Sequence, residues 1–315
     1  MILAAGFGTR LRPLTEHIPK PLIPLANRPL LAWTLDSVQR AGVKRLVINL
    51  HHLREMIPAV AKKFKPDHVD ITWSREDTIL GTGGALVKVK AFVKQGTFFL
   101  INGDIFSQVD LLQALEFHRA NGFAATMVVR PLPDDCTFTP LQRDESGRLV
   151  SFKAIETKPK GSVSPCMFCG VHVLEPEILD YLPESGFSCV NDQGYTGMMK
   201  AGLDIGTFLY QGPWFDVGTP WRYLQASTAL LSGSIRVPGF IAPTNGVLLD
   251  PDAVVSRKAE LGPNVAIGSG CSIPDGAVVR SSILLPGTRI RQGDILDSCI
   301  ASPDVMMHGI NRQKS

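Results

Sequence analysis

Apolar and polar residues alternate with two different periodicities along the first 130 residues. Apolar spacings of three and four residues predict helices over residues 30–41, 53–64, 83–92 and 110–120. Pro58 lies inside the second of these segments and is expected to break or kink it. Short apolar runs predict strands over residues 44–50, 69–74, 97–101 and 124–129. Strands that alternate with helices in this way predict a parallel sheet with helices on both faces.

The pattern changes beyond Leu141. Residues 141–152 predict a hairpin with its turn at residues 144–147. A strand, a short helix, a strand and a longer helix are then expected over residues 166–174, 176–182, 206–211 and 221–231. Together these elements predict an α/β fold, with a Rossmann-like mixed, mostly parallel sheet and helices on both faces.

A period of six residues marks the last part of the chain. Apolar residues occupy two phases of this period, at positions 253, 259, 265, 271, 277 and 283 and at positions 255, 261, 267, 273, 279 and 285. A hexapeptide period predicts a β-helix of about two coils, and the match resembles a left-handed parallel β-helix. Arg289 breaks the small-residue phase, so the coil is expected to fray after Pro286.

The predicted organisation has four parts. They are an α/β domain over residues 1–232, a linker containing glycine and proline over 233–249, a β-helix cap over 250–300 and a mobile tail over 301–315. The short first strand leaves open whether residues precede Met1 in the natural chain.

Composition narrows the class of protein. The chain has 315 residues, with 44% hydrophobic residues, 19% charged residues and a formal net charge of +3. This charge is too small to argue for nucleic acid or a membrane as a partner. No apolar run approaches the ~20 residues of a spanning helix. No signal peptide is visible either, so a cytoplasmic location is expected.

Six cysteines are then expected to be free thiols. Cys166 and Cys169 form a Cys-x-x-Cys pair in a strand-like run. No second pair or histidine cluster completes a zinc site, so buried thiols are the expected interpretation.

The amino end carries the most informative stretch. The apolar run 1–5 ends at Gly6–Gly8, where successive backbone N–H groups can form an anion-binding concavity. Arg10, Arg12 and Lys20 add positive charge. A strand that ends in such a turn is suited to holding phosphates. The Walker A pattern and the dinucleotide fingerprint are both missing from this stretch.

The complete stretch of residues around these glycines is a more specific signature than the glycines alone. Leu3-Ala4-Ala5-Gly6-x-Gly8-Thr9-Arg10-Leu11-x-Pro13-Leu14-Thr15, followed by Pro19-Lys20-Pro21, resembles the signature of the sugar-1-phosphate nucleotidylyltransferases, or NDP-sugar pyrophosphorylases. The resemblance implies a Mg²⁺-dependent reaction in which an NTP and a sugar 1-phosphate give an NDP-sugar and pyrophosphate. The domain layout favours a mannose-1-phosphate guanylyltransferase that binds GTP. A uridylyltransferase acting on glucose, N-acetylglucosamine or muramic-type 1-phosphates is the alternative.

The same resemblance implies roles for individual residues. The expected nucleotide-binding residues are Leu3, Ala4, Ala5, Gly6, Gly8, Thr9, Arg10, Gly81 and Thr82. The residues expected at the sugar phosphate are Lys20, Gly103, Glu156, Lys158 and Gly170. The sequence departs from the family at Thr157, which stands where the glutamate of a Glu-Lys-Pro motif is expected. The identity of the sugar therefore stays open.

Two carboxylates are the candidate metal ligands. Asp104 ends an apolar strand, and Asp216 lies in a Trp-x-Asp-x-Gly-Thr motif that supplies a ligand in the family. Mg²⁺ prefers one or two carboxylates together with phosphates and waters. Ligands of open α/β sheets sit at the carboxyl ends of strands, so Asp104 and the Gly6–Gly8 turn are expected to share a crevice. The expected catalytic residues are Arg10, Lys20 and Asp104.

Two other function classes match parts of the sequence. Hexapeptide β-helices often belong to acyltransferases, which resemblance implies use a histidine base. No histidine lies between Ala253 and Ile300, so the cap is expected to support contacts in a homo-oligomer instead. A regulatory paralogue that binds nucleotide sugar without turnover is disfavoured, because the expected catalytic residues and Asp216 are all present. A transferase would serve nucleotide-sugar biosynthesis, for example for cell-envelope polysaccharide.

Overall fold

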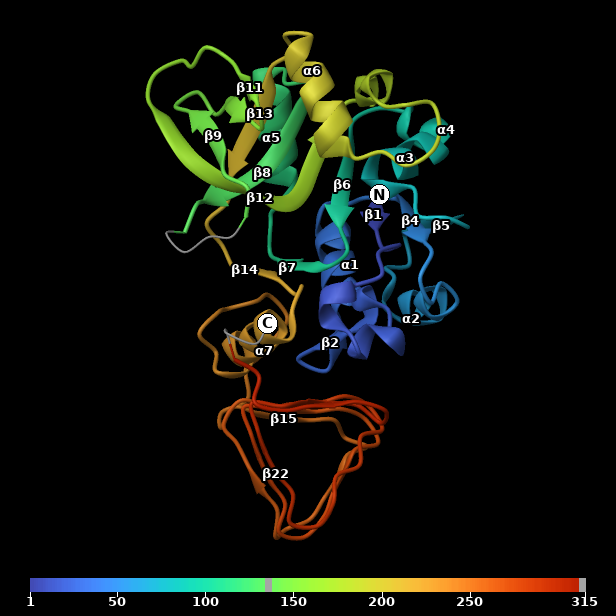
Figure 1. Ribbon diagram of the computed structural model, residues 1–315, viewed down its shortest axis with the longest axis vertical. Helices are drawn as coiled ribbons and strands as arrows, with labels where there is room; N and C mark the ends of the chain where they lie inside the picture. Colours follow the sequence, from blue (N-terminus) through green and yellow to red (C-terminus); the bar gives the residue numbers. More distant parts are fainter. Residues whose placement is uncertain (134–137, 312–315) are drawn as a thin grey trace.

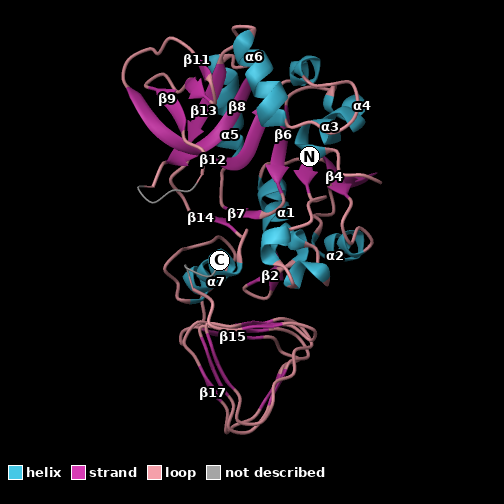
Figure 2. Cartoon of the chain, viewed as in Figure 1, coloured by secondary structure: helices cyan, strands magenta, loops and turns pink. Residues whose placement is uncertain are grey.

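The computed structural model describes residues 1–133 and 138–311. Figure 1 shows an α/β part that contains the amino end, and a triangular coil of strands that follows it in the chain. Figure 2 shows that helices belong to the α/β part, and the described residues beyond Leu231 form strands and loops. No helix within the described ranges combines the length and apolar character needed to cross a membrane.

The main sheet is mixed, and the four strands at one end of it are parallel. Its strand order is β11-β10-β9-β12-β6-β1-β4-β5, and β8 pairs with both β12 and β13. The parallel strands at this end are β6 (Phe98–Asn102), β1 (Ile2–Leu3), β4 (Arg45–Leu50) and β5 (Asp70–Arg75). The other strands are β8 (Ala125–Pro131), β9 (Leu141–Asp144), β10 (Leu149–Phe152), β11 (Ile155–Glu156), β12 (Val163–Leu174) and β13 (Ile205–Leu209). The predicted α/β class is confirmed.

Neighbouring residues of the central strands enter two different apolar cores. Val47 and Leu100 belong to one buried cluster, and Ile48 and Ile101 belong to the other. Because successive side chains of a strand point to opposite faces, the two cores lie on the two sides of the sheet. The helices are α1 (Leu30–Arg40), α2 (Met56–Phe64), α3 (Gly81–Lys88), α4 (Lys90–Val93), α5 (Leu111–Asn121), α6 (Thr196–Lys200) and α7 (Pro220–Leu231).

Local chemistry explains where several helices begin and end. The Asp110 carboxylate accepts from the backbone N–H of Leu112 and Gln113, and Gly122 ends α5 in the left-handed region at φ 63°. The expectation that Pro58 breaks a helix is wrong. Helix α2 begins at Met56, which places Pro58 in the first turn, where its missing N–H costs no hydrogen bond.

The sequence pattern missed several short elements. These include the antiparallel ribbon of β7 (Ile105–Ser107) and β14 (Trp214–Asp216), and the hairpin of β2 (Pro24–Leu25) and β3 (Arg28–Pro29). The short helix expected over residues 176–182 is the 3₁₀ helix η4 (Pro176–Tyr181). The helices that were missed are the 3₁₀ helices η1 (Thr9–Leu11), η2 (Leu14–Glu16) and η3 (Lys20–Leu22) and the π-helix η5 (Val190–Tyr195). Such short elements depend on tertiary pairing, which periodicity cannot reveal.

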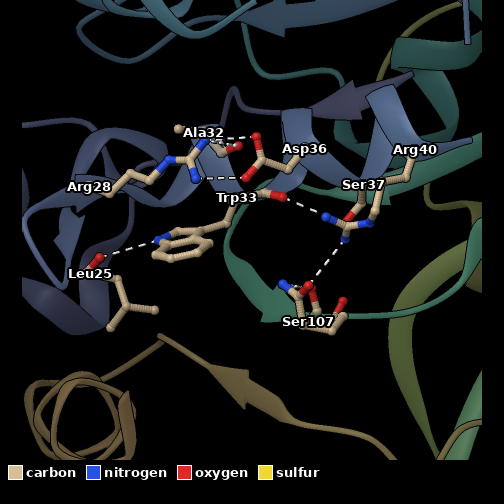
Figure 3. A network of polar contacts seen from close by, with 9 residues as sticks. Leu25, Arg28, Ala32, Trp33, Asp36, Ser37, Arg40 and Ser107 are labelled. Atoms are coloured by element: carbon tan, nitrogen blue, oxygen red, sulfur yellow. Dashed lines mark hydrogen bonds and ion pairs between the residues drawn. The ribbon is translucent and has the colours of Figure 1, made fainter. Parts of the chain in front are cut away.

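A polar network fixes α1 against the hairpin and β7. The Arg28 guanidinium lies 2.7 Å from the Asp36 carboxylate, and Trp33 Nε1 donates to the Leu25 carbonyl at 3.2 Å (Figure 3). At the other end of α1, Arg40 donates to the Gln108 side chain at 3.1 Å. The hairpin follows η3 directly, so this network also steadies the segment that carries Lys20.

The cap is a β-helix-like coil of parallel strands. Strands of successive coils pair in parallel, as Val247 does with Val265 and Val254 with Ser272, and the last strand, β24, pairs antiparallel with β23. Its strands are β15 (Val247–Leu249), β16 (Val254–Val255), β17 (Glu260–Leu261), β18 (Val265–Ile267), β19 (Ser272–Ile273), β20 (Val278–Arg280), β21 (Ile283–Leu284), β22 (Ile295–Asp297), β23 (Ile300–Ala301) and β24 (Met306–Met307). The handedness of the coil stays a prediction.

The coil does not fray after Pro286. Parallel pairing continues from β20 to β22 and from β21 to β23. Arg289 points outward, and Ile290 takes the buried position beside it, so the break in the hexapeptide phase is absorbed by a shift of one residue. The tail also differs from the expectation, because Ile310 is buried in the apolar cluster around α7.

Candidate functional site

A cavity of about 360 Å³ opens at the carboxyl ends of the parallel strands. All the residues predicted to bind the nucleotide lie on its wall, namely Leu3, Ala4, Ala5, Gly6, Gly8, Thr9, Arg10, Gly81 and Thr82. Lys20 and Asp104 line it as well, together with Pro21, Glu76, Ile79, Asn102 and Gly218. The structure therefore brings segments about 200 residues apart in sequence to one crevice, as the position of strand ends predicts.

The loop that follows β1 is held in a conformation that favours glycine. Gly8 has φ 64°, and a Cβ at this position would lie 2.9 Å from the Thr15 methyl carbon. The Thr15 hydroxyl donates to the Gly8 carbonyl at 2.9 Å, and His52 Nε2 lies 2.6 Å from the Thr15 carbonyl. This bracing leaves Gly6, Gly8 and Thr9 along the cavity wall.

Lys20 lies at the centre of the charged groups. Its side chain is buried, and Nζ lies 2.8 Å from Asp104 Oδ2 and 3.7 Å from Asp216 Oδ1. Asp104 follows β6 through Gly103, where a Cβ would come within 2.6 Å of the Leu3 carbonyl. Glycine at this position lets the chain turn close to β1. The two carboxylates, far apart in sequence, are thus placed around a single cation.

Asp216 is 7% exposed and is surrounded by positive charge. It pairs with Ile105 across the β7–β14 ribbon, which Figure 1 places between the main sheet and α7. Arg222 Nη1 lies 2.7 Å from Asp216 Oδ2, and Arg10 Nη2 lies 3.7 Å from the same oxygen. A Cβ on Gly218 would come within 2.6 Å of the Asp216 carboxylate, so this glycine leaves room for the ion pairs.

The carboxylate pair fits a divalent hard cation. Across residues 1–133 and 138–311, no group of three or more His, Cys, Asp or Glu side chains is placed to hold a metal. Mg²⁺ does not require such a group, because it binds through one or two carboxylates together with substrate phosphates and waters. Asp104 is 40% exposed toward the cavity, so its carboxylate is accessible to a cation.

The far wall of the cavity carries a buried carboxylate that sequence reasoning missed. Glu76 is 1% exposed, accepts from Asn49 Nδ2 at 2.8 Å through Oε1, and accepts from the Leu80 backbone N–H at 3.0 Å through Oε2. Asn49 in turn accepts from the Ala4 backbone N–H at 2.7 Å. The available signal was an acidic residue directly after a strand, the same signal that singled out Asp104.

The residues predicted for the sugar phosphate separate into two groups. Gly170 has φ 81° at an irregularity in β12, where a side chain would run into Ile105 and Asn102. It therefore packs against Asn102, which lines the cavity, without being part of the lining itself. Glu156 and Lys158 are exposed at and just after the edge strand β11, away from the cavity wall. The structure does not bring these two residues to the other site residues.

The Cys-x-x-Cys pair takes no part in the site. Cys166 and Cys169 are buried and free, and burial raises the pKa of both thiols to about 12. A buried thiol with a raised pKa is a poor nucleophile at neutral pH. Cys189, Cys271 and Cys299 are free as well, and Cys136 lies outside the described residues.

Comparison with known proteins supports the same interpretation. A family model described as Nucleotidyl transferase matches residues 1–233, and a model described as GMPPB C-terminal domain matches residues 244–312. The chain is 30% identical over 319 residues to Mannose-1-phosphate guanylyltransferase 1 of Arabidopsis thaliana. The alignment covers 98% of this chain and 86% of that relative.

Two further similarities differ in what they show. The chain is 29% identical over 320 residues to the UTP--glucose-1-phosphate uridylyltransferase of Synechocystis sp., with 95% of this chain and 81% of that relative covered. The crystal structure of HddC from Yersinia pseudotuberculosis shares the fold at a TM-score of 0.59 and 24% identity, over 71% of this chain and 96% of that one. The first family model matches residues 1–233, which is most of the chain and includes the residues that form the cavity and its charged groups. The chain therefore belongs to the nucleotidyl transferase family.

Proposed function

We propose that this chain is a mannose-1-phosphate guanylyltransferase, which makes GDP-mannose and pyrophosphate from GTP and mannose 1-phosphate. The family and the named relatives make it a nucleotidyltransferase that acts on a sugar 1-phosphate. The observation that carries the proposal is the convergence of Asp104 and Asp216 on Lys20 at a cavity lined by glycine backbone.

The proposed reaction joins two anions, so positioning and charge compensation supply most of the catalysis. An oxygen of the sugar phosphate attacks the α-phosphorus, and the bond from that phosphorus to the β-phosphate oxygen breaks. In the proposed roles, Arg10 steadies the departing pyrophosphate and Lys20 contacts the α-phosphate and the sugar phosphate. Asp104 and Asp216 would hold Mg²⁺, which when bound offsets phosphate charge and orients phosphate oxygens.

Glu76 supports guanine as the base. Guanine presents two neighbouring N–H donors, N1–H and N2–H, on its Watson–Crick edge, and a carboxylate is an acceptor-only group that can take both. Each Glu76 oxygen accepts one protein hydrogen bond and retains a further lone pair. Uracil presents one N–H between two carbonyl oxygens, which a carboxylate repels. The Synechocystis relative keeps a uridylyltransferase on glucose, N-acetylglucosamine or muramic-type 1-phosphates as the second candidate.

The test is a matrix of the five common NTPs against a panel of sugar 1-phosphates with Mg²⁺, read as pyrophosphate release. The expected result is the highest kcat/KM for GTP with mannose 1-phosphate. A maximum for UTP would establish the second candidate instead. No release with any pair, while nucleotide sugar still binds, would favour the non-catalytic paralogue. The variant Asp104→Asn should lose turnover by orders of magnitude and keep its fold.

The cap is proposed to support a homo-oligomer. Its first coil has no coil before it, so β15, β16 and β17 each have one unpaired edge, and Val254 is 70% exposed there. A second copy could cover this end. Sedimentation of the wild-type chain and of Val254→Asp tests the idea, because a loss of the oligomer is expected only in the variant. The cytoplasmic location and the domain limits stay predictions from the sequence.

A further inference from the structure

We propose that Arg222 is a positioning residue that turns the Asp216 carboxylate toward the shared metal position. The inference rests on the proposed function, because it concerns how this chain would hold Mg²⁺. The cavity lining includes Lys20 and Gly218 but neither Asp216 nor Arg222, and Arg222 contacts the site through the Asp216 carboxylate.

The contacts of Asp216 divide between its two oxygens. Oδ2 lies 2.7 Å from Arg222 Nη1 and 3.7 Å from Arg10 Nη2. Oδ1 lies 3.7 Å from Lys20 Nζ, the same nitrogen that lies 2.8 Å from Asp104. Of these three cations, Arg222 is the one at hydrogen-bonding distance. It therefore ties down Oδ2 and leaves Oδ1 facing the point where the two carboxylates meet.

Arg222 is itself held in place by the start of α7. The Thr219 hydroxyl accepts from the Arg222 backbone N–H at 3.4 Å and caps the helix, and Pro220 occupies its first position. The guanidinium carbon lies 4.6 Å from the centre of the Phe138 ring, a cation–π distance. The side chain is 27% exposed, so solvent competes only partly for it.

The next residue of α7 links the helix to the Lys20 segment. The Tyr223 hydroxyl donates to the Pro24 carbonyl, and Pro24 begins β2, which closely follows the η3 helix that carries Lys20. Further along α7, Leu230 packs in one apolar cluster with Ile283 and Ile300 of the cap. One helix thus sets the relative positions of Asp216 and Lys20, and the cap braces it from the other side.

Without Arg222, the Asp216 carboxylate would be free to rotate toward Arg10 and Lys20. Both of these cations would then compete with a metal for the same oxygens. Groups that orient a metal ligand typically contribute 10–100-fold to metal affinity. We therefore expect loss of Arg222 to weaken metal binding and to leave the nucleotide cradle of Gly6, Gly8 and Thr9 in place.

The experiment uses the full chain with Arg222→Gln, Arg222→Lys and a matched control, Arg280→Gln. Arg280 also pairs with a carboxylate, that of Glu260 at 3.4 Å, but on the exposed surface of the cap. Mn²⁺ binding is measured by electron paramagnetic resonance without turnover. The Mg²⁺ dependence of kcat and the KM for GTP are measured in parallel, and circular dichroism checks the fold.

The expected result is a Kd for Mn²⁺ about tenfold higher in Arg222→Gln, with a matching rise in the Mg²⁺ concentration for half-maximal rate. The KM for GTP should change less than twofold. Arg222→Lys should recover much of the affinity, because a single N–H contact to Asp216 is within reach of an ammonium. Arg280→Gln should match the wild type.

Two results separate this inference from the proposed function. An active enzyme whose Arg222→Gln variant keeps wild-type Mn²⁺ affinity would overturn the positioning role alone. A wild-type chain that releases no pyrophosphate, but loses Mn²⁺ affinity on Arg222→Gln, would overturn the proposed function and support the positioning role. A raised KM for GTP with unchanged metal affinity would show that Arg222 acts on nucleotide, which also overturns the inference.

Discussion

Replacing Lys20 with methionine should separate turnover from metal binding. The ammonium lies 2.8 Å from Asp104 and 3.7 Å from Asp216, so it holds the space between them. Methionine keeps most of the side-chain volume and removes the charge. Loss of one preorganised donor to developing charge typically lowers kcat by about 10²–10³-fold, or about 2.7–4 kcal/mol. We expect a loss of this size in Lys20→Met.

The effect on stability should be smaller than that on turnover. Breaking a fully buried ion pair costs about 3–5 kcal/mol, and an exposed pair contributes about 0–1 kcal/mol. Asp104 is 40% exposed, and Asp216 keeps Arg222 as a partner, so the site lies between these limits. A decrease of about 1–3 kcal/mol in the free energy of unfolding follows, measurable by urea denaturation.

Metal binding should change in the opposite direction. In the wild type, a divalent cation that binds both carboxylates must displace the Lys20 ammonium. Two carboxylates without that ammonium repel each other and attract a cation more strongly. Lys20→Met should therefore bind Mn²⁺ more tightly than the wild type in the absence of nucleotide. Asp104→Asn is the matched comparison, because it should lose both metal affinity and turnover.

The assay combines pyrophosphate release with Mn²⁺ titration by electron paramagnetic resonance. Full turnover in Lys20→Met would refute the electrostatic role of the lysine. Weaker Mn²⁺ binding in the same variant would refute the shared position between the two carboxylates. The first result tests the catalytic role of Lys20, and the second tests whether the metal binds at the position that Lys20 occupies between the two carboxylates.

Three further predictions concern other parts of the molecule. Glu76→Gln should shift the kcat/KM ratio of GTP to UTP toward UTP, because an amide can donate to a uracil carbonyl; an unchanged ratio would remove Glu76 from base recognition. Burial lowers the pKa of His172 from 6.5 to about 3, so the unfolded chain takes up a proton first and stability should fall as pH falls from 6.5 to about 3. The slope of Tm against pH should flatten in His172→Phe, and an equal slope would contradict this. Iodoacetamide at pH 8 should modify the half-buried Cys189 before Cys166 and Cys169, as intact-mass analysis can show, and equal rates would count against their burial.

The part of the cavity wall that we predict to bind nucleotide could be predicted because its geometry is local. Gly6–Gly8 follows a strand directly, and such a turn must lie at the carboxyl edge of the sheet. Asp104 obeys the same rule, since it follows β6 through a single glycine. Where a residue lies within two or three positions of a strand end, topology alone brings it to the crevice. That is why these predicted residues line the cavity.

Arg222 was not predicted because its importance depends on partners distant in sequence. In the sequence, Arg222 is an ordinary basic residue near the start of an amphipathic helix, a type usually found solvated. Only the pairing of β14 with β7 brings Asp216 to the site and Arg222 with it. Glu76 follows β5 directly and so obeys the same strand-end rule as Asp104, although the sequence analysis did not apply that rule to it.

The residues predicted for the sugar phosphate show where a family motif fails to predict the position of a side chain. Thr157 stands in place of the expected glutamate, and the strand that carries Glu156 pairs at the edge of the sheet, where both Glu156 and Lys158 face solvent. A motif predicts position only while the backbone around it keeps the register that aims its side chains. Strand β11 lies at the edge of the sheet, several strands away from β1, whereas Gly170 packs against Ile105 and Asn102 in a left-handed conformation that allows no side chain. On the proposed function, we therefore expect sugar selection to depend on Asn102 and Asp104, which line the cavity, and on Gly170 beside them, and variants there should alter the KM for the sugar phosphate before those at β11 do.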